Sequence, residues 1–412
     1  MGSKRSWLLG FLLLGLSNLV GQNRSLKLEP ITSKLEIPFE LEQNFVILSV
    51  LFDNTIPLNF IFDTGSEQSL LIDKNISDIL QLPYSREFKV IGADQSTILK
   101  AYLVQSIDLL MGKFQVKNKP ILVLDQDYFQ FEKYTGLKIH GILGADIFRT
   151  FSVKINYRKR ILTLINHERL EKHLKKGYQK VQCEFYKSKP YINGFATMED
   201  KSQIPLKLLL DTGAGLSMLV YTNSDSTLTP PSKTIINPIG FGLGGYLEGY
   251  LGRIQQFKIN DQLFFNELTT NFQEIDTTIS EIRENAPNGI LGNLILQRFT
   301  IIIDYVKGEV YLKPHRKFNK KIKFDQSGLI LIAGGPELKE FYVHKVIPNS
   351  PAALAGVKAG DLILKVNHWP SGLLTLYSIR NKLKKKPGKK IKLTVLREEE
   401  KKVFNFTLKT LI

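Results

Sequence analysis

Leu58-Asn59-Phe60-Ile61-Phe62-Asp63-Thr64-Gly65 brings an apolar run directly into an Asp-Thr-Gly tripeptide, and the run Ile204 to Leu210 leads in the same way into Asp211-Thr212-Gly213. The two tripeptides are 211 − 63 = 148 residues apart. The same offset relates further identical residues without gaps, among them Ser69 and Ser217, Gly92 and Gly240, Tyr102 and Tyr250, and Gly141-Ile142-Leu143-Gly144 and Gly289-Ile290-Leu291-Gly292. A repeat of this length indicates a duplicated domain, because solenoid units run to about 20 to 50 residues. Each half is therefore expected to supply one aspartate to a joint site.

The chain is expected to be mainly β and to divide into several units. Short apolar runs bounded by turn residues predict strands in residues 36–166 and again in residues 179–315, which form two lobes. Residues 167–178 link them, and His167 to Lys176 is expected to be a short helix with Gly177 at its C-terminal cap. A basic connector, residues 316–325, leads to a C-terminal domain at 326–412.

Residues 1–22 have the order of a secretory signal peptide. Lys4 and Arg5 precede an apolar stretch from Trp7 to Leu16, and small or polar residues follow it. The alternative is an uncleaved anchor, which needs about 20 apolar residues to span a bilayer. The single cysteine, Cys183, cannot form an intrachain disulfide, and exported proteins without disulfides are more typical of a bacterial envelope. We therefore expect a secreted or periplasmic protein of bacterial type.

Gly-Ile-Leu-Gly elements follow the two aspartates at one distance, since 141 − 63 and 289 − 211 are both 78. Together with the apolar strand before each aspartate, this combination resembles the retropepsin-like aspartic proteases, with two copies of the half-site fused into one chain. The resemblance covers about residues 36 to 315. It implies two closed β-barrel lobes related by a pseudo-twofold axis, and aspartic endopeptidase activity on polypeptide substrates without any cofactor or metal.

Asp63 and Asp211 are the candidate catalytic residues. Two carboxylates a few ångström apart cannot both ionise at little cost, so such a pair holds one shared proton. The ionised member can then activate a water while the protonated member acts as an acid. The expected supporting residues follow each aspartate: Thr64, Gly65 and Ser66 in lobe 1, and Thr212, Gly213 and Ala214 in lobe 2.

Two finer expectations concern these supporting residues. The resemblance implies that the Thr64 and Thr212 hydroxyls brace the two loops against each other. Ser66 can hydrogen-bond the neighbouring carboxylate and favour its ionised form, whereas Ala214 cannot, so the lower microscopic pKa is assigned to Asp63. The sequence departs from the family at Asp125 to Lys138, an aromatic and charged stretch that is longer than a minimal retroviral lobe holds.

Each lobe also carries a candidate flap, a hairpin tip that covers the site. The tips start at Gly92 and Gly240, and 92 − 63 and 240 − 211 are both 29. The predicted flap residues are Gly92 and Ala93 in lobe 1 and Gly242, Gly244 and Gly245 in lobe 2. The glycines make the second tip loose, as a moving lid requires. An ordinary glycine-rich hairpin is the alternative.

Residues 326–412 resemble the PDZ domains of bacterial envelope proteases. The residues that carry the resemblance are Ser350-Pro351-Ala352-Ala353, Ala355-Gly356 and Gly360-Asp361. It implies a small β-sandwich or barrel with one or two helices, in which a peptide adds as a strand beside a helix at about Thr375 to Lys384. A loop at Gly328, Leu329, Ile330 and Leu331 would hold the peptide's C-terminal carboxylate. The alternative is a closed PDZ domain that packs on the protease without binding peptide.

The net charge of +17 is uneven, and residues 326–412 hold 16 Lys and Arg against 6 Asp and Glu. The run Lys384 to Lys390 could touch an anionic membrane surface, although a solvated helix end and turn explains it as well. Nucleic-acid binding is not expected, because no aromatic pattern accompanies the lysines. His140 is interpreted as structural. The function that competes with a protease is a non-catalytic envelope scaffold that binds peptides.

Overall fold

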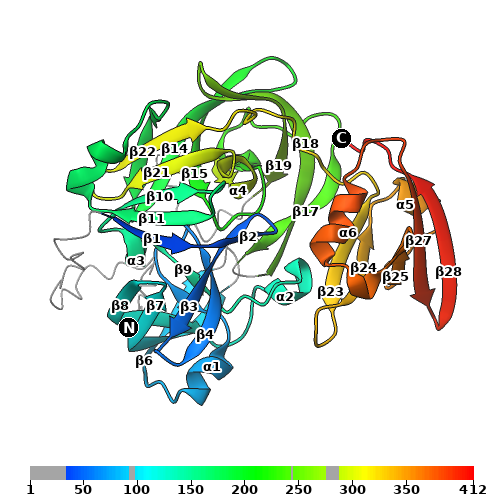
Figure 1. Cartoon of the computed structure of the whole chain (residues 1–412). Coiled ribbons are helices and arrows are strands. Elements are labelled where there is room, and N and C mark those ends of the chain that lie inside the picture. The colour runs from blue at the N-terminus through cyan, green and yellow to red at the C-terminus, as the bar shows by residue number, and fades with distance from the viewer. Residues whose placement is uncertain (1–33, 92–97, 243–244, 275–286) are drawn as a thin grey trace, which may run out of the picture.

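The computed structural model of the chain describes residues 34–91, 98–242, 245–274 and 287–412. The predicted signal peptide and the predicted flap residues Gly92, Ala93 and Gly244 lie outside these residues. Within them the protein is mainly β, with two barrel lobes and a C-terminal domain of five main strands (Figure 1). The expected fold class is confirmed.

Lobe 1 closes into a six-stranded barrel. Its strands follow the order β3-β4-β9-β5-β8-β7, and β7 returns to β3 through Leu51 and Leu110, while β2 and β6 extend the sheet. The elements of this lobe are β2 Glu40–Glu42, β3 Phe45–Phe52, β4 Ile56–Phe62, β5 Leu70–Leu71, α1 Lys74–Ile79, β6 Tyr84–Ile91, β7 Ile98–Met111, β8 Phe114–Leu124, α2 Phe131–Thr135, β9 Gly141–Leu143 and α3 Ala145–Phe148. Closure leaves no free edge in the ring of six strands.

Lobe 2 repeats this barrel in the order β14-β15-β20-β16-β19-β18, with β18 paired back to β14. Its elements are β13 Cys183–Tyr186, β14 Lys189–Thr197, β15 Gln203–Asp211, β16 Met218–Tyr221, η2 Thr222–Ser224, β17 Ile235–Gly242, β18 Gly245–Asn260, β19 Leu263–Gln273, β20 Gly289–Gly292 and α4 Asn293–Leu296. The flap residues Gly242 and Gly245 are opposite each other at the ends of β17 and β18. The hairpin interpretation of this segment is therefore correct.

A separate six-stranded sheet joins the lobes in the order β1-β11-β10-β21-β22-β12. Its strands are β1 Lys34–Pro38, β10 Ser152–Asn156, β11 Ile161–Ile165, β12 Gln179–Val181, β21 Phe299–Asp304 and β22 Glu309–Pro314. At its centre β10 pairs antiparallel with β21, and Lys154 is opposite Ile302. Since 154 + 148 = 302, these two residues are repeat equivalents, and the pseudo-twofold axis passes between them.

Repeat-equivalent positions in the two lobes form the same hydrogen bond even where the residue types differ. The His140 Nδ1 accepts the backbone N–H of Asn59 at 3.0 Å. The Asn288 Oδ1 accepts the backbone N–H of Lys207 at 2.8 Å, and 59 + 148 = 207. The imidazole and the amide therefore tie the same strand in the two lobes, and the structural interpretation of His140 is confirmed.

The linker between the lobes differs from the expectation. It forms a 3₁₀ helix, η1 His167–His173, whose C-terminal cap is Leu174. Gly177 has φ +95° but lies three residues beyond that cap. The side chain of Leu170 is buried against Ile165 and Ile302 of the joining sheet, so packing on this sheet fixes where the helix ends.

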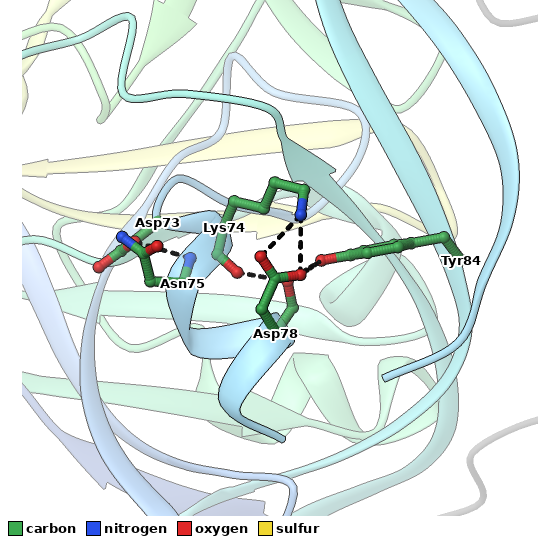
Figure 2. A network of polar contacts seen from close by, with 6 residues as sticks. Asp73, Lys74, Asn75, Asp78 and Tyr84 are labelled. Atoms are coloured by element: carbon green, nitrogen blue, oxygen red, sulfur yellow. Dashed lines mark hydrogen bonds and ion pairs between the residues drawn. The ribbon is translucent and has the colours of Figure 1, made fainter. Parts of the chain in front are cut away.

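The base of the lobe 1 hairpin is fixed by the polar network of Figure 2. The Lys74 Nζ donates to both carboxylate oxygens of Asp78, at 2.8 and 2.7 Å, and the Tyr84 hydroxyl donates to the same carboxylate at 2.5 Å. Asp73 caps α1 by accepting the N–H of Asn75 at 3.0 Å. Because Tyr84 is the first residue of β6, this network holds the start of the hairpin against α1.

The C-terminal domain has its own core and follows the strand order β23-β24-β25-β27-β28. Its elements are β23 Leu329–Gly334, β24 Glu340–Val346, α5 Pro351–Leu354, β25 Leu362–Val366, β26 Trp369–Pro370, η3 Ser371–Leu373, α6 Leu376–Leu383, β27 Lys390–Arg397 and β28 Glu400–Thr407. The domain lies beside both lobes, next to α2 and the β17–β18 hairpin (Figure 1). No helix in the described part of the chain is long and apolar enough to cross a bilayer.

Candidate active site

The two Asp-Thr-Gly loops meet at the interface between the lobes. Asp63 follows the last residue of β4 and Asp211 is the last residue of β15, and the β9 and β20 strands run parallel to them. The Asp63 N–H donates to the Leu143 carbonyl at 3.0 Å. The Gly-Ile-Leu-Gly elements thus support the loops from behind.

The threonines of the two loops hold each other across the pseudo-twofold axis. The Thr64 N–H donates to the Thr212 hydroxyl at 3.1 Å, and the Thr212 N–H donates to the Thr64 hydroxyl at 3.0 Å. Each hydroxyl in turn donates to a backbone carbonyl of the other lobe, Thr64 to Leu210 at 2.6 Å and Thr212 to Phe62 at 2.7 Å. Both side chains are fully buried. These four bonds fix the spacing of the two loops.

Each glycine of the tripeptide lies against the carboxylate of the opposite lobe. A Cβ atom on Gly65 would come within 2.7 Å of the Asp211 Cγ, and one on Gly213 within 2.3 Å of the Asp63 Cγ. Such distances are shorter than any real Cβ contact, so a larger residue would push the two carboxyl groups apart. Glycine is required here for close approach, and neither residue has a positive φ.

The two carboxyl groups are hydrogen-bonded to each other and share one proton. Burial raises the pKa of Asp63, while the hydrogen bond with Asp211 and the backbone N–H groups of Gly65, Ser66 and Gly213 oppose that rise. Burial, followed by repulsion from Asp63, holds the pKa of Asp211 well above its ordinary value. Both pKa values are therefore raised, that of Asp211 more strongly, and the two carboxyl groups titrate as one unit.

The bond expected from the Ser66 hydroxyl to the Asp63 carboxylate is not formed. The Ser66 hydroxyl donates to the Gln68 carbonyl at 2.8 Å, not to the Asp63 carboxylate. The backbone N–H of Ser66 makes the bond to Asp63 instead. Ala214 offers the corresponding backbone N–H to Asp211 at 2.9 Å, so the missing hydroxyl costs the second carboxyl nothing. The expectation for the Ser66 side chain was wrong.

The Ser66 hydroxyl is consequently dispensable for the titration of the pair. We expect Ser66→Ala to leave both pKa values of the pH–rate profile unchanged within about 0.3 units, because this hydroxyl donates to the Gln68 carbonyl and not to either carboxyl group. One pKa unit corresponds to about 1.4 kcal/mol of interaction with the titrating pair. The measurement is kcat/KM on one peptide across the pH range for wild type and variant. A shift of the acidic limb by half a pH unit or more would show that the Ser66 hydroxyl does stabilise the ionised Asp63 carboxylate, as first expected.

Two charged residues near the pair were not predicted. Burial lowers the pKa of Lys189, and Glu67, Asp211 and Asp63 oppose that shift by their negative charge. Burial raises the pKa of Glu67, which Lys187 and Lys189 oppose. Lys189 is the first residue of β14 and Glu67 follows Ser66, so only the folded arrangement of the two lobes brings these charges to the site.

Comparison with known protein families agrees with this geometry. Residues 48–147 match the family model described as aspartyl protease, and residues 318–408 match the model described as PDZ domain. The chain is a two-lobed, retropepsin-like protein with a C-terminal PDZ domain. Relatives of this PDZ-bearing protein include the serine endoprotease DegS of Salmonella typhimurium (strain 14028s / SGSC 2262), 33% identical over 76 residues, which are 18% of this chain and 21% of DegS.

Tax1-binding protein 3 of Homo sapiens is 34% identical over 64 residues, which are 16% of this chain and 52% of that protein. The chain thus spans about a fifth of the length of the first relative and about half of the second. A solved structure of photosystem II D1 C-terminal processing protease aligns over 20% of this chain and 22% of its own, with 23% identity and a TM-score of 0.19. Because these matches cover only 16–20% of the chain, they do not show the activity of the two lobes.

Proposed function

We propose that the protein is an aspartic endopeptidase in which Asp63 and Asp211 activate a water for attack on a peptide bond. The observation that supports this most strongly is the hydrogen-bonded pair of buried carboxyl groups, whose loops are held by reciprocal threonine bonds. A peptide-binding scaffold would not need two buried acids in contact, because their desolvation is costly unless the arrangement serves chemistry.

The chemistry follows from the state of the pair. Asp63 takes a proton from water, whose oxygen forms a bond to the carbonyl carbon, while Asp211 donates its proton to the carbonyl oxygen. The tetrahedral intermediate then expels the amine as its C–N bond breaks. The proton held by Asp63 passes to the leaving nitrogen, and Asp211 regains its proton from the oxygen. One water is consumed, and one carboxyl and one amino terminus are formed.

The decisive experiment offers the purified chain a denatured polypeptide and analyses the products by mass spectrometry. We expect internal cleavage that persists in the presence of a metal chelator and of a serine-acylating reagent. Cleavage abolished by the acylating reagent would point to a serine nucleophile and overturn the proposal. Binding of the polypeptide without any cleavage would instead support the non-catalytic scaffold.

The pH dependence gives a further test of the shared proton. We expect a bell-shaped profile of kcat/KM, because the pair works only between its two macroscopic pKa values. Since burial and Asp63 hold the pKa of Asp211 well above its ordinary value, the alkaline limb should lie above the usual carboxyl range of about 4. The measurement uses an uncharged, amide-capped peptide. A rate that keeps rising from pH 5 to pH 9 would contradict the dyad.

The finer features of the proposal are supported by the sequence, the family matches and the exposure of one basic run. The signal-like segment at residues 1–22 supports an exported, envelope-located protease. Polypeptides are the proposed substrates, and peptides the proposed ligands of the PDZ domain. Weak contact with anionic membrane through residues 385–390 is consistent with their exposure. N-terminal sequencing of the protein secreted by a bacterial host would test export.

A further inference from the structure

Residues 129–136 of lobe 1, here named the plug segment, lie against the groove of the PDZ domain. The helix α2 of this segment lies beside β23 and contacts it (Figure 1), and α6 also contacts β23. The interval between this strand and this helix is where the resemblance to PDZ domains places the peptide groove. A Cβ atom built on Gly136 would be 3.6 Å from the Cβ of Ala333 on β23 and 3.3 Å from the Cβ of Leu376 on α6. The end of the plug segment thus reaches into the interval between strand and helix.

A single arginine ties the plug segment to both walls of the groove. The Arg380 Nη2 on α6 donates to the carbonyl of Tyr134 at 2.8 Å and to the carbonyl of Leu331 on β23 at 2.7 Å. The ring of Tyr134 is buried and meets the ring of His344 on β24 edge to face, with 5.8 Å between centroids. Burial lowers the pKa of Arg380 to about 10, and Asp325 opposes this shift.

The edge that a peptide would use is therefore already engaged. Among the described strands β23 pairs only with β24, and the plug segment contacts β23 through α2. A peptide adds to such an edge through backbone hydrogen bonds. Here the Leu331 carbonyl of this strand is bonded to Arg380, which also holds the plug segment.

The loop at the end of the groove is also engaged by the chain itself. The carboxylate Oδ1 of Asp325 accepts the N–H groups of Ser327 at 2.8 Å and Gly328 at 2.6 Å. The N–H of Leu329 donates to the Ser327 hydroxyl at 3.1 Å. The loop can therefore hold a carboxylate, and the one that it holds belongs to the chain. An incoming C-terminus has to compete for these donors.

The far side of the plug segment is connected to the loop of the second aspartate. The Gln43 Nε2 donates to the Thr135 carbonyl at 2.8 Å, and the next residue, Asn44, donates through its Nδ2 to the Gly215 carbonyl at 3.1 Å. Gly215 is four residues after Asp211. The ring of Phe131 packs edge to face on that of Phe45 at 6.0 Å, which fixes the same turn of lobe 1 against the plug segment.

The plug segment also supports the lobe 1 hairpin. Phe129 and Phe131 share one buried cluster with Phe88 of β6 and Ala101 of β7. On the other lobe, Lys345 of β24 forms an ion pair with Glu248 of β18. The plug segment and the PDZ domain thus contact both hairpins that carry the predicted flaps, and the plug segment is linked to the loop of Asp211 through Gln43 and Asn44.

We propose that the plug segment is the resident occupant of the PDZ groove, and that a peptide with a free, apolar C-terminus displaces it and thereby slows the protease. Displacement removes the Thr135 carbonyl from Gln43 and loosens the hold of Asn44 on the Asp211 loop. The regulatory part rests on the proposed function. Hydrolysis of each peptide bond creates a new C-terminal carboxylate. The proposed ligands are therefore cleavage products with apolar C-termini, and their binding to the PDZ domain inhibits the protease that formed them.

A disulfide can test occupancy directly in the full chain. The Cβ separation of 3.6 Å between positions 136 and 333 falls within the range of disulfides, about 3.5 to 4.5 Å. The variant Gly136→Cys/Ala333→Cys is made in a Cys183→Ser background, and its reduced form is the matched control. The probe is a fluorescent peptide of about ten residues that ends in two valines with a free carboxylate, and its C-terminal amide is the control ligand.

We expect the oxidised variant to bind the probe at least about 10-fold more weakly than the reduced variant, measured by anisotropy. Equal affinity in both forms overturns the proposal, since a fixed plug would then leave the groove open. A second variant, Tyr134→Ala, weakens the contact with His344 without a new cross-link and should bind the probe more tightly than wild type. Tyr134→Phe keeps the ring as its control. An affinity of Tyr134→Ala no higher than that of wild type also overturns the proposal.

Coupling to the active site has a readout that needs no activity. Hydrogen exchange of the backbone amides in residues 211–217 should become faster when the probe binds, and should not change in the oxidised variant. Hydrolysis of an amide-capped peptide should slow about 3-fold or more with saturating probe, again only in the reduced form. If hydrogen exchange at residues 211–217 does not change when the probe is bound, the coupling between groove and active site is rejected. If exchange becomes faster but the chain hydrolyses no peptide, only the proposed protease activity is rejected.

Discussion

Asp63→Asn and Asp211→Asn should each lower kcat for peptide hydrolysis by about 10²- to 10⁴-fold, the range of a general acid or base removed from its reaction. Asparagine keeps the volume of the side chain but can neither take a proton from water nor return one to the carbonyl oxygen. Because the pair works as one unit with one shared proton, the two variants should be almost equally impaired. Wild type and variants are compared by kcat and KM on the same capped peptide.

The same variants must be shown to fold. Folding raises the pKa of Asp211 above its unfolded value, so the wild type loses stability as pH rises through the raised pKa. Asn cannot titrate, and the Tm of Asp211→Asn should therefore equal that of wild type at low pH and exceed it near pH 7. Asp261→Asn on the exposed surface is the control and should change neither kcat nor Tm. Activity that survives in either dyad variant would exclude the intramolecular pair.

The sequence predicts the candidate active site because duplication makes the signal periodic. Asp63 and Asp211 recur at one offset together with the Gly-Ile-Leu-Gly elements, and the pseudo-twofold axis of the joining sheet brings the two Asp-Thr-Gly loops together. The reciprocal bonds between the two threonines, each from a backbone N–H to the opposite hydroxyl, agree with the same symmetry, because they form only if the loops of Thr64 and Thr212 face one another. The site can therefore be predicted from the sequence because the two duplicated lobes are related by a pseudo-twofold axis.

Local hydrogen bonds are predicted less well. The Ser66 hydroxyl has two acceptors within reach of a tight loop, the Asp63 carboxylate and a backbone carbonyl, and it donates to the Gln68 carbonyl. Residue type alone does not decide between them, because the rotamer depends on how the loop is held by Gly144 and Ala145. Backbone N–H groups, which every sequence supplies, lower the pKa of both aspartates and so replace the hydroxyl that was expected at Ser66.

The contact between the plug segment and the PDZ domain has no sequence signal. Tyr134 and Arg380 are 246 residues apart and belong to no repeat, and their bond uses a backbone carbonyl, which carries no side-chain information. The only hint is that Asp125 to Lys138 is longer than a minimal lobe requires. Such a stretch predicts an additional surface element, and only the folded chain shows that this element faces the groove.

Thr64→Val and Thr212→Val should destabilise the protein more than the other variants considered. Valine has nearly the shape of threonine but leaves the N–H of the opposite threonine and a carbonyl of the other lobe without partners in a dry interior. Each such buried group costs about 1–3 kcal/mol, so each variant should lose about 2–6 kcal/mol of unfolding free energy. The measurement is the denaturant midpoint at constant m-value.

Thr64→Ser and Thr212→Ser are the matched controls, because serine keeps the hydroxyl and removes only a methyl group. They should unfold close to wild type and keep their kcat, whereas the valine variants should lose kcat even where they remain folded, since the two loops are no longer held at the spacing that lets Asp63 and Asp211 share a proton. The two valine variants should also be similar to each other, because each breaks one half of a symmetric set of bonds. A valine variant as stable and as active as its serine control would show that packing of the joining sheet, and not the threonine hydroxyls, sets the geometry of the pair.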